Sequence, residues 1–143
     1  MLVSAGYNVR ASDVSQEQLD LLSKRLPNVE TVIEDFNQPM QGVKDGSVDG
    51  IIEVAADRYM TVDGQKKYVQ ESQRVLKKNG VLIWPLFLGE CTHKLKYGLK
   101  WKAGKKEISQ LLEDNGFRIA SDKKYFYKIN SQQIFDLLVA KKL

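Results

Sequence analysis

The fold is decided by residues 7–15, which read Tyr-Asn-Val-Arg-Ala-Ser-Asp-Val-Ser. Apolar and polar residues alternate over positions 8–11, a pattern that is typical of a half-buried β-strand. Asp13 falls where this strand would end, and Ser15 with Gln18 three residues later has the capping-box pattern that begins a helix. An acid at the carboxyl end of a parallel strand is where an open α/β sheet holds ribose hydroxyls. The stretch therefore predicts a strand, an acid that faces a ligand, and a helix.

Length and composition indicate one globular domain that spans residues 1–143. The chain has 22 Lys and Arg against 18 Asp and Glu, and the net charge of +4 permits a nucleic-acid partner without requiring one. Hydrophobic residues make up 43% of the chain, which excludes wholesale disorder. The single cysteine, Cys91, excludes an internal disulfide. Because the sequence has neither a signal-peptide pattern nor an apolar run long enough to span a membrane, we expect a cytoplasmic protein without membrane contact.

The first half of the chain alternates strand and helix patterns. Residues 1–6 resemble the last turn of a helix closed by a glycine. A helix is predicted over 15–26 and a β-branched strand over 29–33, followed by a polar loop. Residues 49–56 are almost continuously apolar, which suits a central parallel strand covered on both faces.

The second half continues this alternation and closes with a hairpin. Thr61 or Asp63 can cap a helix that we expect to end at Asn79-Gly80, before an apolar strand over 81–86. A last helix around 108–112 precedes two strands, about 117–129 and 134–140, which are too close in sequence for a parallel crossover. The predicted order is β-α-β-β-α-β-α-β-β, an α/β domain with an antiparallel edge.

The ordered set of these segments resembles the class I S-adenosylmethionine-dependent methyltransferases, which have a Rossmann-like, mostly parallel sheet. The landmarks that carry the resemblance are the second to seventh strands with their flanking turns, at residues 9–15, 32–36, 45–52, 74–83, 113–117 and 135–141. No single landmark is specific, and the order of the whole set carries the identification.

The resemblance implies S-adenosylmethionine as cofactor and assigns adenosine contacts. By this similarity Asp13 accepts the ribose hydroxyls and Asp35 the adenine amino group, while Phe36 and Val14 line the two faces of the adenine. Each role has a plainer alternative: a helix-capping acid for Asp13, a solvated loop acid for Asp35 and a core aromatic for Phe36. Glu53, a further candidate cofactor contact, lies within the apolar fourth strand of the family pattern, where an acid is costly unless it is paired or belongs to a site.

One part of the family pattern has no counterpart in residues 1–143. The first strand, the glycine-rich loop and most of the first helix are absent, so the sequence resembles a truncated member that begins in that helix. The loop contacts the methionine part of the cofactor, so cofactor binding is expected to be weak or lost. The missing strand normally lies between the second and fourth strands. The gap would be closed by direct pairing of those strands, by a second copy in a homodimer, or by another polypeptide.

Candidate contacts for the methyl acceptor follow the fourth and fifth strands. Asp57 and Tyr59 are candidates, although an exposed loop is an equal alternative. No Asn/Asp-Pro-Pro-aromatic segment occurs there, which disfavours methyltransferases that act on base amino groups. His93 is a candidate base, with a plain surface histidine as the favoured alternative. Together with Cys91 it makes too few ligands for zinc, so no metal is expected.

A lysine-rich stretch over residues 94–106 also contains Tyr97 and Trp101. Such a stretch could bind phosphates and stack a base, or a substrate could contact Trp101, but a solvated loop is the favoured interpretation. The leading prediction is therefore an S-adenosylmethionine-dependent methyltransferase, or the major fragment of one, with a small-molecule or macromolecular acceptor left open. The alternatives are a non-catalytic interaction module or subunit completed by a partner, and a nucleic-acid-binding protein.

Overall fold

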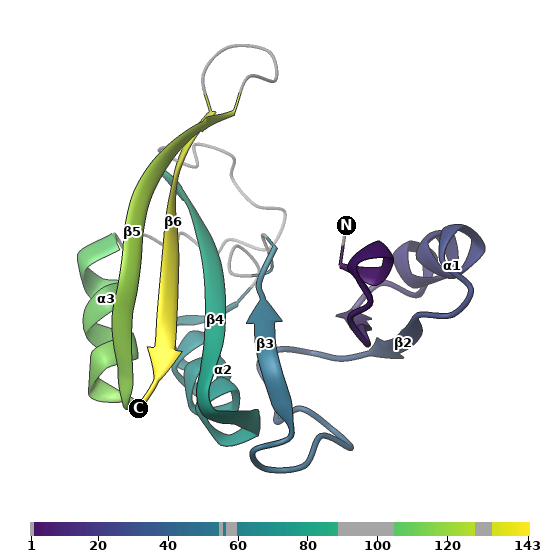
Figure 1. Ribbon diagram of the computed structural model, residues 1–143, viewed down its shortest axis with the longest axis horizontal. Helices are drawn as coiled ribbons and strands as arrows, with labels where there is room; N and C mark the ends of the chain where they lie inside the picture. The colour runs from purple at the N-terminus through teal and green to yellow at the C-terminus, as the bar shows by residue number, and fades with distance from the viewer. Residues whose placement is uncertain (1, 55, 57–59, 89–104, 128–132) are drawn as a thin grey trace.

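The computed structural model describes residues 2–54, 56, 60–88, 105–127 and 133–143, and it confirms the predicted α/β order. These described residues form a short 3-10 helix and nine further elements (Figure 1). In order these are η1 (Val3–Ala5), β1 (Arg10–Asp13), α1 (Gln16–Arg25), β2 (Glu30–Ile33), β3 (Val48–Ile52), α2 (Val62–Val75), β4 (Leu76–Leu88), α3 (Lys105–Asp114), β5 (Phe117–Tyr127) and β6 (Gln133–Lys142).

The strands form two separate sheets. β1 pairs in parallel with β2, whereas the other sheet has the order β3-β4-β6-β5. In the larger sheet β3 and β4 are parallel, and β6 runs antiparallel to both β4 and β5, which confirms the predicted closing hairpin. We call residues 2–33 the N-terminal unit and residues 48–143 the C-terminal unit. Figure 1 shows the two units side by side, with β3 at the edge that faces the N-terminal unit.

The division into two sheets excludes one of the ways in which the expected gap could be closed. Direct pairing of the strand that ends at Asp13 with the strand that contains Ile52 was one way to close the expected gap. Among the residues that the structure describes, β1 pairs only with β2 and β3 only with β4, so this prediction is wrong. In the part of the chain that the structure describes, β1 and β3 each have a strand neighbour on one side only.

Among the described residues, the buried cluster of the hydrophobic core lies in the C-terminal unit, and Phe36 and Met40 pack against it. Alternate residues of β4 and β6 point to the face that α2 and α3 cover, where Trp84 and Leu138 are fully buried. Tyr68 of α2 packs edge-to-face on Trp84, with ring centroids 5.5 Å apart. The N-terminal unit buries fewer apolar side chains: among its described residues these are Leu19 and Val29.

The caps of the first two long helices were predicted correctly, and the end of α2 was not. The Ser15 hydroxyl accepts a hydrogen bond from the Gln18 N–H, and the Thr61 hydroxyl accepts one from the Gly64 N–H. The expected stop at Asn79-Gly80 is wrong, because α2 ends at Val75. There the Nζ of Lys142 donates to the carbonyl oxygens of Gln73 and Leu76, at 2.6 and 2.7 Å, and so caps the helix from a distant strand.

The prediction that residues 49–56 form a strand covered on both faces is also wrong in part. The strand exists as β3, but Ile52 is 45% exposed and Val54, just beyond it, is 71% exposed. The other face is covered, because Ile51 packs against the core. An apolar run predicts that a strand can be buried, and it does not tell whether a layer is present to bury it.

Candidate functional site

Two acids lie at the carboxyl ends of the paired strands β1 and β2. Asp13 is the last residue of β1 and is in register with Ile33, the last residue of β2. The backbone continues the pairing one step further, because the Glu34 N–H donates to the Asp13 carbonyl at 3.1 Å. Asp35 follows directly. The structure therefore brings the two predicted adenosine contacts to one edge of the small sheet, as expected for parallel neighbours.

The side chain of Asp13 has a local structural role in addition to its position. Its Oδ1 accepts a hydrogen bond from the Ser15 N–H at 2.8 Å, which turns the chain from β1 into α1. Asp13 is half-buried, while its neighbour Val14 is 61% exposed. A carboxylate has about four acceptor positions, so one bond to the backbone leaves capacity for a ligand.

Asp35 is exposed and is held by a turn of its own. Its Oδ1 accepts from both the backbone N–H and the side-chain amide of Asn37, at 2.9 and 2.8 Å. Asn37 in turn accepts from the Thr61 N–H at 3.2 Å, which ties the end of β2 to the start of α2. Sequence reasoning missed Asn37. The Asp-Phe-Asn spacing is a recognisable Asx-turn signal, but its contact with Thr61 is not visible in the sequence.

Sequence reasoning also missed an ion pair that joins β1 to the end of β2. Glu34 is buried, and its Oε1 accepts a hydrogen bond from Arg10 Nη2 at 2.7 Å. The same Nη2 donates to the Gln41 carbonyl at 2.9 Å. A buried acid that is paired in this way positions the chain after β2 and holds the neighbouring Asp35 at the sheet edge.

The other two predicted cofactor contacts face the core of the C-terminal unit. Phe36 packs edge-to-face on Tyr68, with ring centroids 5.8 Å apart, which is the arrangement of a core aromatic. Glu53 is 3% exposed, and its backbone N–H donates to the Ile83 carbonyl at 3.0 Å. Neither side chain lies on the exposed edge that carries Asp13 and Asp35.

The surface beside Asp35 is shallow. A hollow of about 80 Å³ lies there, lined by residues 33–35, 38, 39 and 41. Small-molecule sites usually enclose about 300–1,000 Å³, so this hollow is too small for a nucleoside. A hollow of about 420 Å³ lies on the surface of α3, lined by Lys106, Glu107 and their neighbours, and its lining includes none of the predicted site residues that the structure describes. Among the described residues, the surface that carries Asp13 and Asp35 has no enclosing pocket of that size.

The remaining candidates lie outside the described residues. These are Asp57, Tyr59, Cys91, His93, Tyr97 and Trp101, together with most of the lysine-rich stretch. At the end of that stretch Lys105 forms an ion pair with Asp122 and Lys106 is exposed. Within the described ranges, no group of three or more His, Cys, Asp or Glu side chains could hold a metal ion. No helix in the described part is both long and apolar enough to cross a membrane.

Solved structures share this fold across both units. A methyltransferase from Methanosarcina mazei, described as S-adenosylmethionine-dependent, matches 99% of this chain with a TM-score of 0.80 and 20% identity, and this chain covers 85% of it. A TehB-like methyltransferase from Corynebacterium glutamicum matches 99% with a TM-score of 0.71 and 15% identity, and this chain covers 71% of it. These identities show similarity of fold alone.

A third neighbour was solved with a cofactor product. The 1,6-didemethyltoxoflavin-N1-methyltransferase of Burkholderia thailandensis, which holds S-adenosylhomocysteine, matches 98% of this chain with a TM-score of 0.77 and 16% identity. This chain covers 63% of that enzyme. No curated protein sequence matches. The sequence profile described as "Methyltransferase domain" matches residues 1–84, more than half of the chain, and the chain therefore belongs to the methyltransferase-domain family.

Proposed function

We propose that this protein is an S-adenosylmethionine-dependent methyltransferase, or the larger part of one, and that it holds the adenosine half of the cofactor with Asp13 and Asp35. The observation that carries the proposal is the position of these acids: Asp13 ends β1, and Asp35 lies two residues beyond the end of the adjacent parallel strand β2. Family membership supports the cofactor class, as does the neighbour that holds S-adenosylhomocysteine.

The chemistry of the edge suits a nucleoside. Asp13 uses Oδ1 for the Ser15 N–H, and in the part of the chain that the structure describes its Oδ2 has no hydrogen-bond partner. That oxygen is available to accept from a ribose hydroxyl. Val14 offers an exposed apolar surface beside it for a base. Asp35 then stands one strand away to accept from an amino group on the base.

The cofactor, when bound, supplies a methyl group activated by the positive sulfur, so positioning supplies much of the rate of transfer. In this proposal the residues of the N-terminal unit bind and orient the nucleoside. Asp57, Tyr59 and His93 remain proposed contacts of the methyl acceptor.

The test is an NMR titration of the ¹⁵N-labelled chain with S-adenosylhomocysteine up to millimolar concentration. We expect saturable shifts of the amide signals of residues 13–14 and 35–36. Asp13→Asn keeps the oxygen that accepts from Ser15 and removes the negative charge, and it should weaken binding about tenfold, the equivalent of about 1.4 kcal/mol. Asp20→Asn, which changes an exposed acid on α1, is the matched control and should leave binding unchanged.

Two outcomes contradict the proposal for this chain. The first is the absence of any saturable shift at millimolar ligand while the spectrum is that of a folded protein. The second is an equal loss of affinity in Asp13→Asn and Asp20→Asn, which would show that only the net charge of the N-terminal unit matters.

A further inference from the structure

The loop that carries Asp35 has both of its ends held by one side chain. Arg10 lies on β1, and its Nη2 donates to the Glu34 Oε1 at 2.7 Å and to the Gln41 carbonyl at 2.9 Å. Residues 34–41, which we call the closed loop, therefore begin and end at the same nitrogen atom. A loop whose ends are fixed has lost much of its conformational freedom, so Arg10 restricts where Asp35 can lie.

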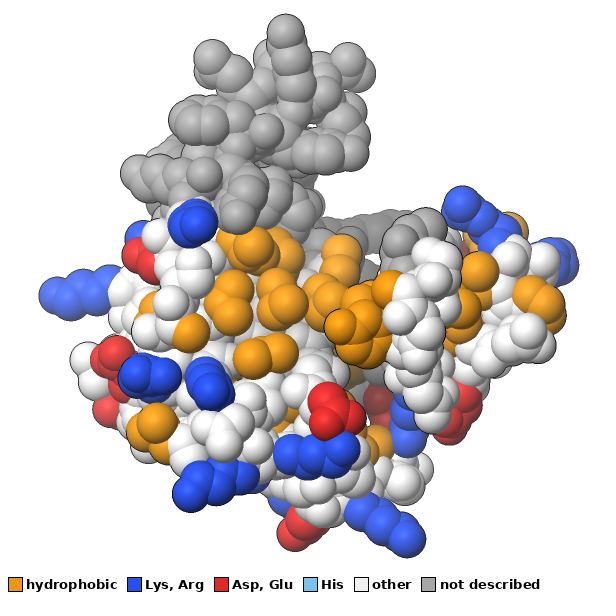
Figure 2. Space-filling view, in the orientation of Figure 1, with side chains coloured by type: hydrophobic (Ala, Val, Ile, Leu, Met, Phe, Trp, Pro, Cys, Tyr) orange, Lys and Arg blue, Asp and Glu red, His pale blue; other side chains and the backbone are white. Residues whose placement is uncertain are grey.

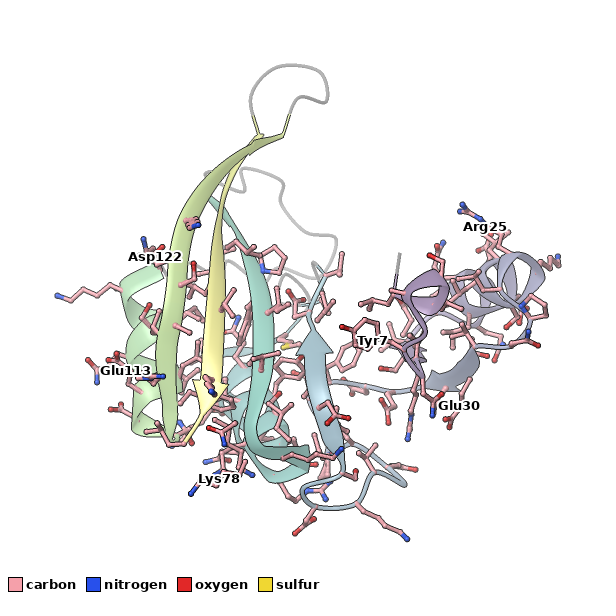
Figure 3. The ribbon with its side chains drawn as sticks, in the orientation of Figure 1. Tyr7, Arg25, Glu30, Lys78, Glu113 and Asp122 are labelled. Carbon is pink, nitrogen blue, oxygen red and sulfur yellow. The ribbon has the colours of Figure 1, made fainter. Side chains whose placement is uncertain are left out.

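The pairing of β1 with β2 places Arg10 for this contact. Arg10 is in register with Glu30, and its Nε lies 3.9 Å from the Glu30 Oε1. In Figure 3 the labelled Glu30 lies at the lower edge of the N-terminal unit, and in Figure 2 acidic and basic side chains gather there. The side chain of Glu34 is only 8% exposed, so its ion pair with Arg10 is shielded from water and holds the chain more firmly than a surface pair would.

The middle of the closed loop is attached to α2. The side chain of Asn37 accepts from the Thr61 N–H at 3.2 Å, and the Met40 N–H donates to the Glu71 Oε2 at 3.0 Å. Figure 1 shows the chain crossing between the two units directly after β2. The loop is thus held at its ends by the N-terminal unit and at its middle by the C-terminal unit, which gives Asp35 a defined place relative to β1.

Arg10 also determines which of two adjacent acids can meet a ligand. Glu34 and Asp35 both line the hollow of about 80 Å³. Glu34 is buried and paired with Arg10, whereas Asp35 is exposed and uses its Oδ1 within its own turn. Within the described residues the Asp35 Oδ2 has no hydrogen-bond partner, so it has the capacity to accept from an amino group. Without Arg10 the charge of Glu34 would repel Asp35 and compete for the same donor.

We infer that Arg10 is a positioning residue that sets the base preference of this edge: it closes the loop and withholds Glu34, so that Asp35 meets the amino group of an adenine. The inference rests on the proposed function, because it concerns the same adenosine contacts. Arg10 itself does not touch the ligand. Its effect on binding is transmitted through the two acids and through the loop that joins them.

A purely structural role for the Arg10–Glu34 ion pair predicts a different result. If the pair only stabilises the small unit, its loss weakens every ligand of the edge to the same extent. If Arg10 positions Asp35, its loss changes the preference between two ligands that differ only in the amino group, because specificity is a difference between two affinities. The ratio of the two affinities therefore separates the two roles.

The experiment compares two ligands by NMR titration of the full chain. One is S-adenosylhomocysteine, and the other, the deamino analogue, has hydrogen in place of the adenine amino group. We expect the parent chain to bind S-adenosylhomocysteine about tenfold more tightly, because the analogue lacks a hydrogen bond to a charged acceptor. Arg10→Met should reduce this preference to less than about twofold, with little change in the affinity for the analogue.

A double variant removes the risk that Arg10→Met fails to fold. Because a buried carboxylate without its partner is strongly destabilising, Arg10→Met/Glu34→Gln removes both charges of the pair. It should lose the preference as well, since the loop is no longer closed. The matched control, Arg25→Met/Glu17→Gln, removes the same two charges from exposed positions on α1 and should keep the preference of the parent.

Spectra without ligand test the closure of the loop by itself. In the double variant the amide signals of residues 35–38 should shift, and the amides of Asn37 and Gln38, which bond to Asp35, should exchange faster. Unchanged signals and exchange there, or an unchanged preference, overturn the inference and leave the proposed function standing, as does a parent that binds both ligands equally. A parent that binds neither ligand contradicts the proposed function and removes the inference with it.

Discussion

The two units of this protein are built from the same kinds of element but differ in what covers them. The C-terminal unit lays α2 and α3 on one face of a four-stranded sheet and buries a cluster that includes Trp84, Leu112 and Phe117. The N-terminal unit has one helix on two strands, with Leu19 and Val29 as its buried apolar side chains. Two strands are marginal by themselves in water. The small unit therefore depends on its connections, although it carries the candidate nucleoside contacts.

The connection between the units combines apolar packing of Phe36 and Met40 on the core with specific polar contacts. Residues 34–47 join them, and Arg74 of α2 holds this segment with hydrogen bonds to the carbonyls of Val43 and Met40. Asn37 adds its contact with the first turn of α2. The candidate site thus lies on a weakly packed unit that apolar and polar contacts of the connecting segment fix to a well-packed one. The predictions below test this contrast, beginning with the largest expected effect.

Replacing a buried leucine by alanine should have different consequences for stability in the two units. Leu82→Ala removes a fully buried side chain of β4 and should lower the free energy of global unfolding by about 2–5 kcal/mol. Leu19→Ala removes the same group from a side chain that is 4% exposed, but it should cost less than about 1 kcal/mol globally, because the small unit opens locally first. Urea unfolding measures the first effect, and faster amide exchange over residues 10–33 reports the second. Equal global costs would show that both units unfold as one.

The contact between Asn37 and the start of α2 can be tested by adding a methyl group at Gly64. A Cβ added at Gly64 would overlap Asn37 Oδ1, so Gly64→Ala must displace the Asn37 side chain and with it the hydrogen bond from the Thr61 N–H. We expect a loss of about 1–3 kcal/mol in thermal unfolding, although alanine normally favours a helix. Asn37→Ala removes the clashing atom, so the double variant should lose less than the sum of the single ones. Strict additivity would contradict the assigned contact.

The contribution of the α2 cap to the stability of the C-terminal unit can be measured by removing the Lys142 ammonium. Lys142→Met keeps an apolar stem and removes the ammonium that bonds to Gln73 and Leu76. The unfolding free energy should fall by about 1–2 kcal/mol, since the helix end loses both hydrogen bonds and a favourable charge. Lys78→Met, which changes an exposed lysine, should have no measurable effect on urea unfolding (Figure 3). The same loss in both variants would indicate a general effect of net charge.

The smallest expected effect is a pH dependence at the connecting segment. The hydrogen bond from Arg74 holds the pKa of the Glu71 carboxyl below its ordinary value of 4.5. Because the folded pKa is the lower one, this stabilisation is complete above pH 4.5 and is lost as the pH falls through the folded pKa. Glu71→Gln should flatten the acid side of the stability curve measured by urea unfolding. Glu113→Gln on the surface of α3 should leave it as steep as in the parent.

Local signals were readable from the sequence, and long-range ones were not. The caps by Ser15 and Thr61 depend on bonds to residues three positions away, so the pattern alone predicts them. The end of α2 was misplaced because Lys142, far along the chain, supplies the cap. The exposed outer face of β3 was missed because apolar residues such as Val54 indicate what a strand could bury, not what is there to cover it.

The candidate site shows the same limit. Strand-end acids at positions 13 and 35 were found because parallel strands bring their carboxyl ends to one edge. The Arg10–Glu34 ion pair and the Asn37 contact were missed, since each joins residues more than twenty positions apart.

The strand order β3-β4-β6-β5 has a consequence for synthesis of the chain. β6 lies between β4 and β5, yet it is made after both. Until residues 133–142 have left the ribosome, β5 has no strand to pair with and β4 has one open side. The large sheet therefore cannot assemble progressively from its first strand outward, because β6 must be inserted between β4 and β5 after both have been made.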